Sequence, residues 1–388
     1  MHLLSNKTIL LISPQSWGKM FVSKHHYAAE LANKGNQVFF LNPPAVNKKK
    51  GEPQISIVSS PQHPGLFIID HWLSFPYNIK FHLISLFHFL MHKHVKRILK
   101  KIGSPDIVWS FDLGNLYLFS FFNEATLKIF HPVDEPLNTT AIDSAKGSQI
   151  IFSVTEEILN KYAAYNVPKH FVNHGVAPEF LNFPIQVKKD NKIRVGFAGN
   201  LLRPDIDRKV FLQIITENPE VIFECWGTHQ LIDANLSGSA DEETDAFIAE
   251  LLQTSNVLLH GAVTPAILAA EIQYMDAFLI CYDVQKDQSK GTNYHKVMEF
   301  ISTGKIVVAN NITTYKNRPD LVQMVPEREH NKMLPGVFKE VINSLAHCNA
   351  ETAQENRKKF AGENTYNKQL LRIEELLQPL YQKLDLKN

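Results

Sequence analysis

The stretch IRVGFAGNLLRPDIDRKVFLQIITENPEVIFECW occupies residues 193–226 and contains one complete structural unit. Its two ends, 193–198 and 221–226, are short runs rich in β-branched and aromatic residues, which predicts two buried strands. Between them, a turn of small residues leads into a segment of helical period over 207–218. Because two strands joined by one helix form a βαβ unit, we predict a parallel sheet wrapped by helices.

The same alternation continues on both sides of this stretch. Downstream, we expect strands at 256–260, 276–282 and 305–310 and helices at 241–254, 265–274 and 294–303. Upstream, we expect strands at 8–13, 37–42, 106–110, 127–131, 149–153 and 170–173. The helix between the first two strands is well marked, since apolar residues recur at helical spacing and Gly35 supplies a left-handed stop. The predicted fold class is α/β, with two Rossmann-like doubly wound domains facing a cleft and helices at the C-terminal end.

The chain length and one irregular segment set the expected domain boundaries. With 388 residues and about 150 per domain, two or three domains are expected. The segment 178–192 has two prolines and a charged run, which is typical of a linker. We therefore predict an N-terminal domain over 1–180 and a C-terminal domain over 181–365. Residues 366–388 are predicted to form a helix that docks back on the N-terminal domain through one apolar face, made of Leu370, Ile373, Leu376, Leu377, Leu380 and Leu384.

Composition excludes several classes of protein. The 40 Lys and Arg residues nearly balance 39 Asp and Glu, so the global basic field that drives nucleic-acid binding is absent. The three cysteines are scattered and form no CxxC pair, which argues against a disulfide framework or a thiolate zinc site. No apolar run is long enough for a signal peptide or a membrane span. We expect a cytoplasmic protein that binds no nucleic acid.

The turn after the strand at 193–198 is the first candidate binding site. Small residues let a phosphate group approach the backbone, and the following helix offers free N–H groups. Arg203 or Arg208 could neutralise a diphosphate there. The alternative is an ordinary strand-to-helix turn in which Asp207 caps the helix. That alternative also accounts for the acidic pair Asp205 and Asp207 better than a metal site does.

A second candidate lies in the segment SKGTNYHKVMEFISTGKIVVANN, residues 289–311. Lys296 and Glu299 are three residues apart and therefore share a helical face. A carboxylate beside a helix start can bind a vicinal diol while the backbone N–H groups bind phosphate. The alternative is a surface ion pair.

Two candidates lie in the first domain. The segment FHPVDEP, residues 130–136, follows a predicted strand, so His131 and Asp134 could orient an acceptor hydroxyl, accept its proton or bond to the transferred sugar. In the alternative, Asp134 only caps a turn between two prolines. The segment SPQSWG, residues 13–18, could close on phosphates, although Gly18 is its sole glycine.

Three blocks of the sequence resemble GT-B glycosyltransferases. They are VGFAGNLLRPDID with NPEVIFECWG, then NVLLHGAVTPAILAAEIQYMDAFLICY, then NYHKVMEFISTGKIVVANN. Their order and spacing are similar to those of the nucleotide-sugar domain of that family. The segments SVTEEILNKY and KHFVNHGVAPEF, before residue 181, resemble the family's hinge. The resemblance covers roughly residues 149–315, and the first domain matches only in its rhythm of strands and helices.

The resemblance implies that residues 1–180 form the acceptor domain and residues 181–365 the donor domain, and it implies roles for particular residues. Gly199 and Asn200 would approach the donor diphosphate. The base pocket would be lined by His260, Gly261 and Val263. Near the helix over 294–303, the resemblance implies phosphate contacts from Asn293 and Tyr294, ribose binding by Glu299, and Lys296 as a neighbour of that site.

Three residues depart from the family pattern. Members that retain anomeric configuration often have a Glu-x7-Glu motif, but Gly291 stands where the first Glu is expected. Asn200 replaces an Arg that commonly follows the turn glycine, which leaves Arg203 or Arg208 as the substitute cation. Ile306 replaces the usual proline.

The predicted helix near residues 79–102 combines basic residues with aromatic ones. Its second half carries Lys93, Lys96, Arg97, Lys100 and Lys101. This composition suits peripheral contact with the inner face of an anionic membrane. The alternative is an ordinary domain helix whose lysines stabilise its C-terminal end.

The resemblance therefore implies a metal-independent, hexosyltransferase-type glycosyltransferase of polysaccharide or cell-surface glycan synthesis. It would move a sugar from a nucleotide donor, a UDP-sugar, to a glycan or lipid-linked acceptor, and it would need no cofactor and no metal. Two alternatives remain open: a catalytically silent GT-B binding subunit, and a GT-B nucleotide-sugar epimerase.

Overall fold

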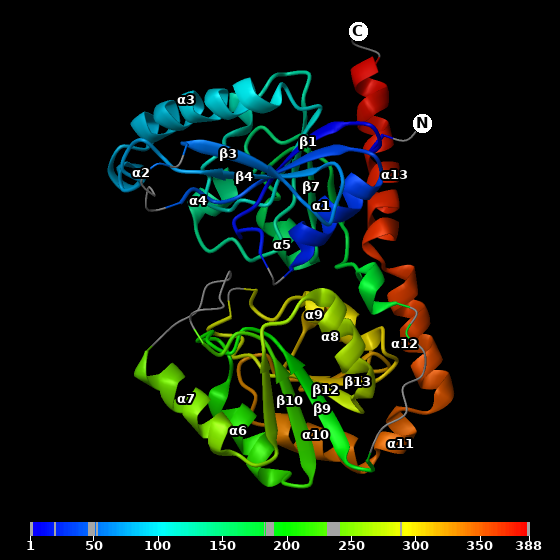
Figure 1. The fold of residues 1–388 in the computed structure, drawn as a ribbon. Helices are drawn as coiled ribbons and strands as arrows, with labels where there is room; N and C mark the ends of the chain where they lie inside the picture. Colours follow the sequence, from blue (N-terminus) through cyan, green and yellow to red (C-terminus); the bar gives the residue numbers. More distant parts are fainter. Residues whose placement is uncertain are drawn as a thin grey trace. The chain divides into compact units, whose positions relative to one another are not determined.

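The protein was analysed as a computed structural model that describes residues 3–18, 21–45, 51, 53–181, 183, 190–230, 241–287 and 289–385. Internal contacts divide the chain into two compact units (Figure 1). The N-terminal unit comprises Met1–Trp17, Val22–Asn173 and Gln369–Asn388. The C-terminal unit comprises Gly18–Phe21 and His174–Lys368. The main boundary thus falls between Asn173 and His174, a few residues before the expected position at 180, and the predicted linker over 178–192 lies partly outside the described residues.

The N-terminal unit contains an eight-stranded sheet in the order β3-β4-β2-β1-β5-β6-β7-β8. All neighbouring strands are parallel except β3 and β4, which are antiparallel. The strands are β1 (Thr8–Ile12), β2 (Gln37–Leu41), β3 (Ile55–Ser59), β4 (Leu66–His71), β5 (Ile107–Ser110), β6 (Leu127–Phe130), β7 (Ile150–Ser153) and β8 (Lys169–Phe171). The helices are α1 (Ser23–Asn33), α2 (Ile79–His82), α3 (Ile84–Ile102), α4 (Thr139–Asp143) and α5 (Glu156–Lys161).

The core of this unit forms between the sheet and α3. Strand residues such as Leu10, Phe39 and Val108 pack with Phe87 and Met91 of α3, and all five are buried. The buried residues of α3 recur at helical spacing, so one face of the helix packs against the core. Each fully buried side chain of this size stabilises the fold by about 1.5–3 kcal/mol.

The C-terminal unit contains a six-stranded parallel sheet in the order β11-β10-β9-β12-β13-β14. Its strands are β9 (Ile193–Ala198), β10 (Val221–Trp226), β11 (Val257–Gly261), β12 (Ala277–Ile280), β13 (Ile306–Ala309) and β14 (Val322–Met324). The helices are α6 (Arg208–Glu217), α7 (Glu242–Gln253), α8 (Pro265–Glu271), α9 (His295–Ile301), α10 (Leu334–Asn343), α11 (Leu345–Cys348) and α12 (Glu351–Glu363). The predicted α/β class of two doubly wound sheets is confirmed.

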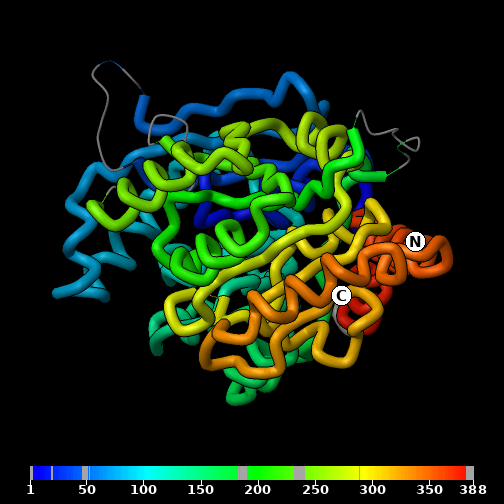
Figure 2. Tube along the Cα trace, turned by 90° about the horizontal axis from the view of Figure 1, so that it is seen from below, coloured from blue at the N-terminus to red at the C-terminus, as the bar shows by residue number. Residues whose placement is uncertain are grey.

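The last helix, α13 (Tyr366–Asp385), crosses the division between the units, which falls after Lys368. Its predicted apolar face is buried at Leu370, Ile373 and Leu377. The Leu4 amide donates to Glu374 Oε1 at 3.0 Å, so the start of the chain and α13 lie side by side, as Figures 1 and 2 both show. No helix among the described residues is both long enough and apolar enough to cross a bilayer.

Five described histidines are buried in the N-terminal unit, at positions 25, 26, 71, 94 and 131, and burial strongly lowers the pKa of three of them, His25, His71 and His94. His94 Nε2 lies 2.9 Å from His71 Nδ1, and His71 Nε2 lies 3.0 Å from the Asn42 carbonyl oxygen and from the Tyr117 hydroxyl. Burial lowers the pKa of His71 to about 4 and that of His94 to about 3. On α1, burial likewise lowers the pKa of His25 to about 4.

These histidines predict a loss of stability in mild acid. An unfolded histidine binds a proton near pH 6.5, whereas the folded ones do so only near pH 4 or below, so the unfolded chain binds more protons in between. The free energy of unfolding should have its full value well above pH 6.5. It should decrease by on the order of 2 kcal/mol per histidine when the pH falls to about 5. Urea unfolding at both pH values measures this slope.

The variant His94→Gln keeps a donor toward His71 but cannot become charged, so it should flatten the slope. The exposed His82→Gln is the control and should leave the slope unchanged. Equal stability of the wild type at pH 7 and pH 5 would contradict the prediction.

Candidate functional site

The topology of the C-terminal sheet marks one edge as the candidate site. Strand β9 has β10 on one side and β12 on the other, so the chain order reverses at β9. In open α/β sheets, ligands bind beyond the carboxyl ends of the strands at such a switch point. The loops that follow β9 and β12 therefore define the site in this unit.

Three glycines bring the strand ends together. The Gly227 amide donates to the Gly261 carbonyl at 2.8 Å, and the Gly199 amide donates to the Trp226 carbonyl at 2.9 Å. A Cβ on Gly227 would lie 1.7 Å from Gly199 O, and a Cβ on Gly199 would lie 2.7 Å from Tyr282 Oη. Only glycine fits at these two positions. Gly199 and Gly261 were predicted site residues, whereas Gly227, which also has a φ of 141°, was missed as one.

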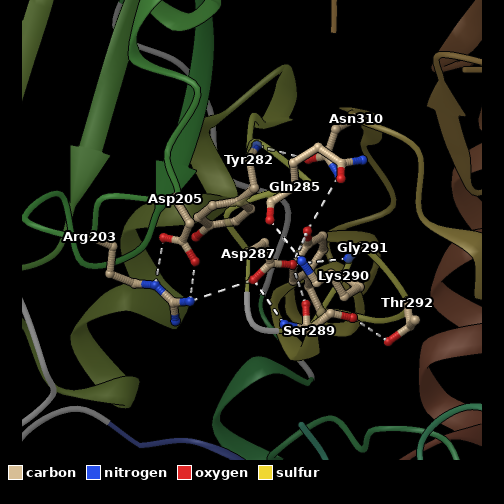
Figure 3. A network of polar contacts seen from close by, with 11 residues as sticks. Arg203, Asp205, Tyr282, Gln285, Asp287, Ser289, Lys290, Gly291, Thr292 and Asn310 are labelled. Carbon is tan, nitrogen blue, oxygen red and sulfur yellow. Dashed lines mark hydrogen bonds and ion pairs between the residues drawn. The ribbon is translucent and has the colours of Figure 1, made fainter. Parts of the chain in front are cut away.

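Arg203 joins the loops after β9 and β12 (Figure 3). Its Nε donates to Asp205 Oδ1 at 2.8 Å, its Nη2 also bonds Asp205, and Nη2 lies 3.6 Å from Asp287 Oδ1. Both carboxylates are buried. Burial works against the charge of Arg203, but the hydrogen bonds and charge of Asp205 raise its pKa overall. Arg203 is therefore already paired with two carboxylates.

Asp287 is the centre of this network, and sequence reasoning missed it. Its Oδ2 accepts hydrogen bonds from the Gly291 amide at 3.0 Å and the Tyr294 hydroxyl at 2.7 Å, as well as from the Ser289 hydroxyl. Burial raises the pKa of Asp205, and the nearby Asp287 carboxylate raises it further against the opposing effect of Arg203. An acidic residue in the middle of a polar loop gives no sequence signal that it is buried.

The other predicted residues of the β9 turn have local roles. Asn200 Oδ1 accepts from the Leu202 amide at 3.0 Å, which tightens the turn. Asp207 caps α6, since its side chain accepts from the Val210 amide at 3.2 Å, as the alternative interpretation expected. The chain's described part contains no cluster of three His, Cys, Asp or Glu side chains that could hold a metal ion.

Arg208 is not brought together with Arg203's two carboxylates. Its Nη2 donates to Thr244 Oγ1 at 2.6 Å, and its Nη1 lies 3.3 Å from Glu243 Oε1. The guanidinium also lies over the Phe247 ring. These contacts are all with α7, so Arg208 holds α6 and α7 together.

The end of β11 presents the predicted base-pocket residues. The His260 ring stacks on Trp226 at 4.9 Å between centroids, and its Nε2 lies 2.9 Å from Glu224 Oε2. Burial tends to raise the pKa of Glu224, but its bonds to His260 and Arg194 lower it overall. Gly261 ends the strand with a φ of 73°, and Val263 is half-buried two residues later.

Helix α9 carries the remaining predicted residues of this unit. Lys296 Nζ lies 2.8 Å from Glu299 Oε2, and the Glu299 side chain is buried. Burial raises the pKa of Glu299, and the charge of Lys296 opposes this. Asn293 is buried, and Tyr294 is the N-terminal capping residue of α9. Burial raises the pKa of Tyr294, and the Asp287 charge adds to the effect.

In the N-terminal unit, His131 is fully buried at the end of β6. It lies among the rings of Tyr27, Trp109, Phe111 and Phe152. Trp109 Nε1 donates to His131 Nδ1 at 3.3 Å. Because the indole nitrogen is only a donor, Nδ1 acts as the acceptor, and a neutral His131 therefore carries its proton on Nε2.

Asp134 is partly exposed and faces a buried lysine that sequence reasoning missed. Lys24 Nζ, in the first turn of α1, lies 4.0 Å from Asp134 Oδ2. Burial lowers the pKa of Lys24, and the Asp134 charge partly restores it. In the segment 13–18, Trp17 packs against His25, Phe40 and His63, as expected for a packed turn.

The comparisons with known proteins agree with this architecture. No protein-family profile matches the sequence, and no curated protein does. Among solved structures, sucrose-phosphate synthase from Thermosynechococcus elongatus is 12% identical with a TM-score of 0.72, over 97% of this chain and 100% of that one. HepE from Anabaena, in complex with UDP and glucose, is 13% identical with a TM-score of 0.64, over 95% of this chain and 98% of that one. WaaG, a glycosyltransferase of lipopolysaccharide biosynthesis, is 11% identical with a TM-score of 0.63, over 95% of this chain and 99% of that one.

These likenesses extend along the whole chain and show its fold. The protein has the GT-B fold of two Rossmann-like domains, which confirms the class of fold that the sequence resemblance implied.

The Asp287 network predicts a stability effect. Asp287→Asn places an amide donor where Oδ2 now accepts from Gly291, Ser289 and Tyr294, and it removes one charge beside Arg203. Breaking a buried charged network of this kind costs about 3–5 kcal/mol. Chemical denaturation of the purified variant measures the loss.

Asp283→Asn is the matched control in the same loop, because Asp283 only accepts from the Gln285 amide in an exposed turn. It should cost less than about 1 kcal/mol. A similar loss in both variants would show that Asp287 has no special structural role.

Proposed function

We propose that the protein transfers a hexosyl group from a UDP-sugar to a glycan or lipid-linked acceptor in polysaccharide or cell-surface glycan synthesis. One observation carries this proposal. At the switch point of the C-terminal sheet, glycine backbone segments pack closely together, and the same unit contains the Lys296–Glu299 pair. The likeness to structures that hold UDP and glucose supports the choice of donor.

The donor diphosphate would lie against the backbone after β9 and β10. Gly199 and Gly227 have no side chains, so phosphate oxygens can approach the main chain there. Arg203 is paired with two carboxylates, Asp205 and Asp287, whereas Lys296 is paired with one, Glu299. Lys296 is therefore the better candidate for the cation that stabilises the departing diphosphate. This assignment needs no metal ion.

The nucleoside would extend along β11 and α9. The half-exposed His260, with Gly261 and Val263, offers the base both ring surface and backbone polar groups. Glu299 would accept hydrogen bonds from the ribose hydroxyls, and Asn293 and Tyr294 would contribute backbone N–H groups near the phosphate. Lys296 keeps the Glu299 carboxylate oriented and offsets its cost of burial.

In the N-terminal unit, we assign the acceptor chemistry to two groups, His131 and Asp134. A neutral His131 carries its proton on Nε2, so that nitrogen would donate a hydrogen bond to the transferred sugar. Asp134 is the partly exposed carboxylate, so it would accept the proton of the acceptor hydroxyl. The nearby Lys24 would help to hold the Asp134 carboxylate in place.

Donor binding provides the first test. Addition of UDP or UDP-glucose should raise the thermal unfolding temperature, because a ligand at about a hundred times its dissociation constant stabilises by roughly 2.7 kcal/mol. Glu299→Gln and Lys296→Met should each weaken UDP-sugar binding at least tenfold by calorimetry. Lys209→Met is the control, since Lys209 is exposed on α6. If no UDP-, GDP- or dTDP-sugar binds at millimolar concentration, the proposal is wrong.

A catalytically silent binding subunit is the second candidate. It is favoured by the full burial of His131 and by the neutralisation of Arg203. Hydrolysis of a bound UDP-sugar, lost in Asp134→Asn with donor affinity retained, would support the transferase. Binding without any hydrolysis or transfer would favour the silent subunit, and recovery of an isomerised sugar nucleotide would favour an epimerase.

A further inference from the structure

An unusual set of apolar side chains is exposed at the start of α3 and on the short helix before it. Phe81 leaves 72% of its surface exposed, Leu83 59% and Phe89 55%. Tyr77, Ile84 and Leu86 are also exposed. Single exposed apolar residues are normal on a protein surface, but six within thirteen positions form a contiguous patch that marks an interaction site.

The fold explains why these side chains stay outside. The core needs only the inner face of α3, where Phe87, Met91 and Val95 are buried. Leu83 separates α2 from α3 with a non-helical backbone (φ −138°, ψ 67°), so the residues before it do not continue the inner face of α3. Figure 1 shows α2 next to the first turn of α3, at the margin of the N-terminal sheet.

The sequence segment around this patch carries charge of one sign, although one buried acid from outside the segment, Asp112, lies close enough to act on Tyr77 and Lys80. From His71 to Pro105 the sequence contains six Lys or Arg residues and neither Asp nor Glu. The formal charge of this segment is therefore +6, whereas that of the whole chain is +1. Among the described residues, no acidic side chain pairs with Lys93, Lys96 or Lys100.

The apolar and basic residues share one stripe of α3. Leu86, Phe89, Lys93, Lys96 and Lys100 are all exposed and follow one another at intervals of three or four residues. Residues at this spacing lie on the same helical face. Lys93 Nζ lies 4.3 Å from the centre of the Phe89 ring, where the apolar half of the stripe meets the basic half.

We propose that this surface, which consists of Tyr77, Phe81, Leu83, Ile84, Leu86 and Phe89 with the lysines at 93, 96 and 100, docks on an anionic lipid bilayer. The aromatic and aliphatic side chains would enter the boundary between headgroups and acyl chains. The lysines would contact lipid phosphates, with their long stems against the apolar layer. The inference does not depend on the proposed transferase activity.

A bilayer fits this surface better than a protein partner does. A protein interface would normally place polar groups around an apolar centre and pair its charges. Here the apolar centre is flanked along the helix by Lys93, Lys96 and Lys100, which pair with no acidic side chain of the described residues. This matches a layered partner with an apolar interior and an anionic surface. Stable peripheral binding requires two contributions, and this surface offers both: apolar side chains that insert into the bilayer and cations that are attracted to anionic lipid.

Vesicle binding of the full chain tests the proposal. The wild type should sediment with vesicles of phosphatidylcholine mixed with phosphatidylglycerol, should bind pure phosphatidylcholine at least tenfold more weakly, and should be released by high salt. Phe81→Ser/Leu83→Ser/Phe89→Ser should abolish binding to both kinds of vesicle. Lys93→Gln/Lys96→Gln/Lys100→Gln should weaken binding to the anionic vesicles at least tenfold and remove its salt dependence.

Exposed residues of the C-terminal unit provide the matched control. Leu252→Ser combined with Lys209→Gln, Lys332→Gln and Lys339→Gln removes exposed side chains of the same kinds and should leave vesicle binding unchanged. Thermal unfolding of each variant should match the wild type, because none of these side chains is in a core.

Three results would overturn the proposal. One is a wild type that binds neither kind of vesicle, and another is equal binding to neutral and anionic vesicles. The third is a lipid-free dimer, detected by sedimentation velocity, that the apolar variant converts to monomer, since a second copy of the chain would then cover the surface. Failure of donor binding would leave the vesicle result unaffected, so the two proposals can fail separately.

Discussion

The guanidinium of Arg203, held between the buried carboxylates of Asp205 and Asp287, is the interaction on which the C-terminal site depends. It ties the turn after β9 to the loop after β12, the two segments at the switch point of the sheet. Through Asp287, the same network fixes Gly291 and Tyr294 and therefore the start of α9. A single cation, bound to two buried carboxylates, thus positions the glycine turn and the helix that carries Lys296 and Glu299.

This arrangement determines which groups of the site can bind a negatively charged ligand. One arginine beside two carboxylates leaves no surplus positive charge, and the raised pKa of Asp205 reflects the cost of burying two acids together. A diphosphate would therefore depend on backbone N–H groups and on Lys296. Asn200, which stands where the glycosyltransferases that this sequence resembles commonly have an arginine, supplies no cation either, because it uses its side-chain oxygen on the turn itself.

Sequence reasoning predicted the parts of this molecule that local pattern determines. The strands β9 and β10 were predicted to the residue, since each is a short apolar run bounded by turn residues. The antiparallel pair β3 and β4 was missed because β3 is short and half-exposed, and edge position weakens the apolar pattern. Sequence reasoning also missed Lys24, Asp287 and the ion pairs of Arg203. Each of these depends on contacts between segments that are distant in the sequence.

The near-zero net charge of the chain conceals a strong local asymmetry. A total of +1 suggests a protein without an electrostatic preference, yet the segment 71–105 alone carries +6, so the remainder must carry −5. A surface is sensed within about one Debye length, roughly 8–10 Å at physiological salt, so an approaching bilayer responds to the local charge and not to the total. The lysines of α3 would therefore be attracted to anionic lipid although the chain as a whole is nearly neutral, and this local attraction would orient the N-terminal unit with α3 toward the bilayer.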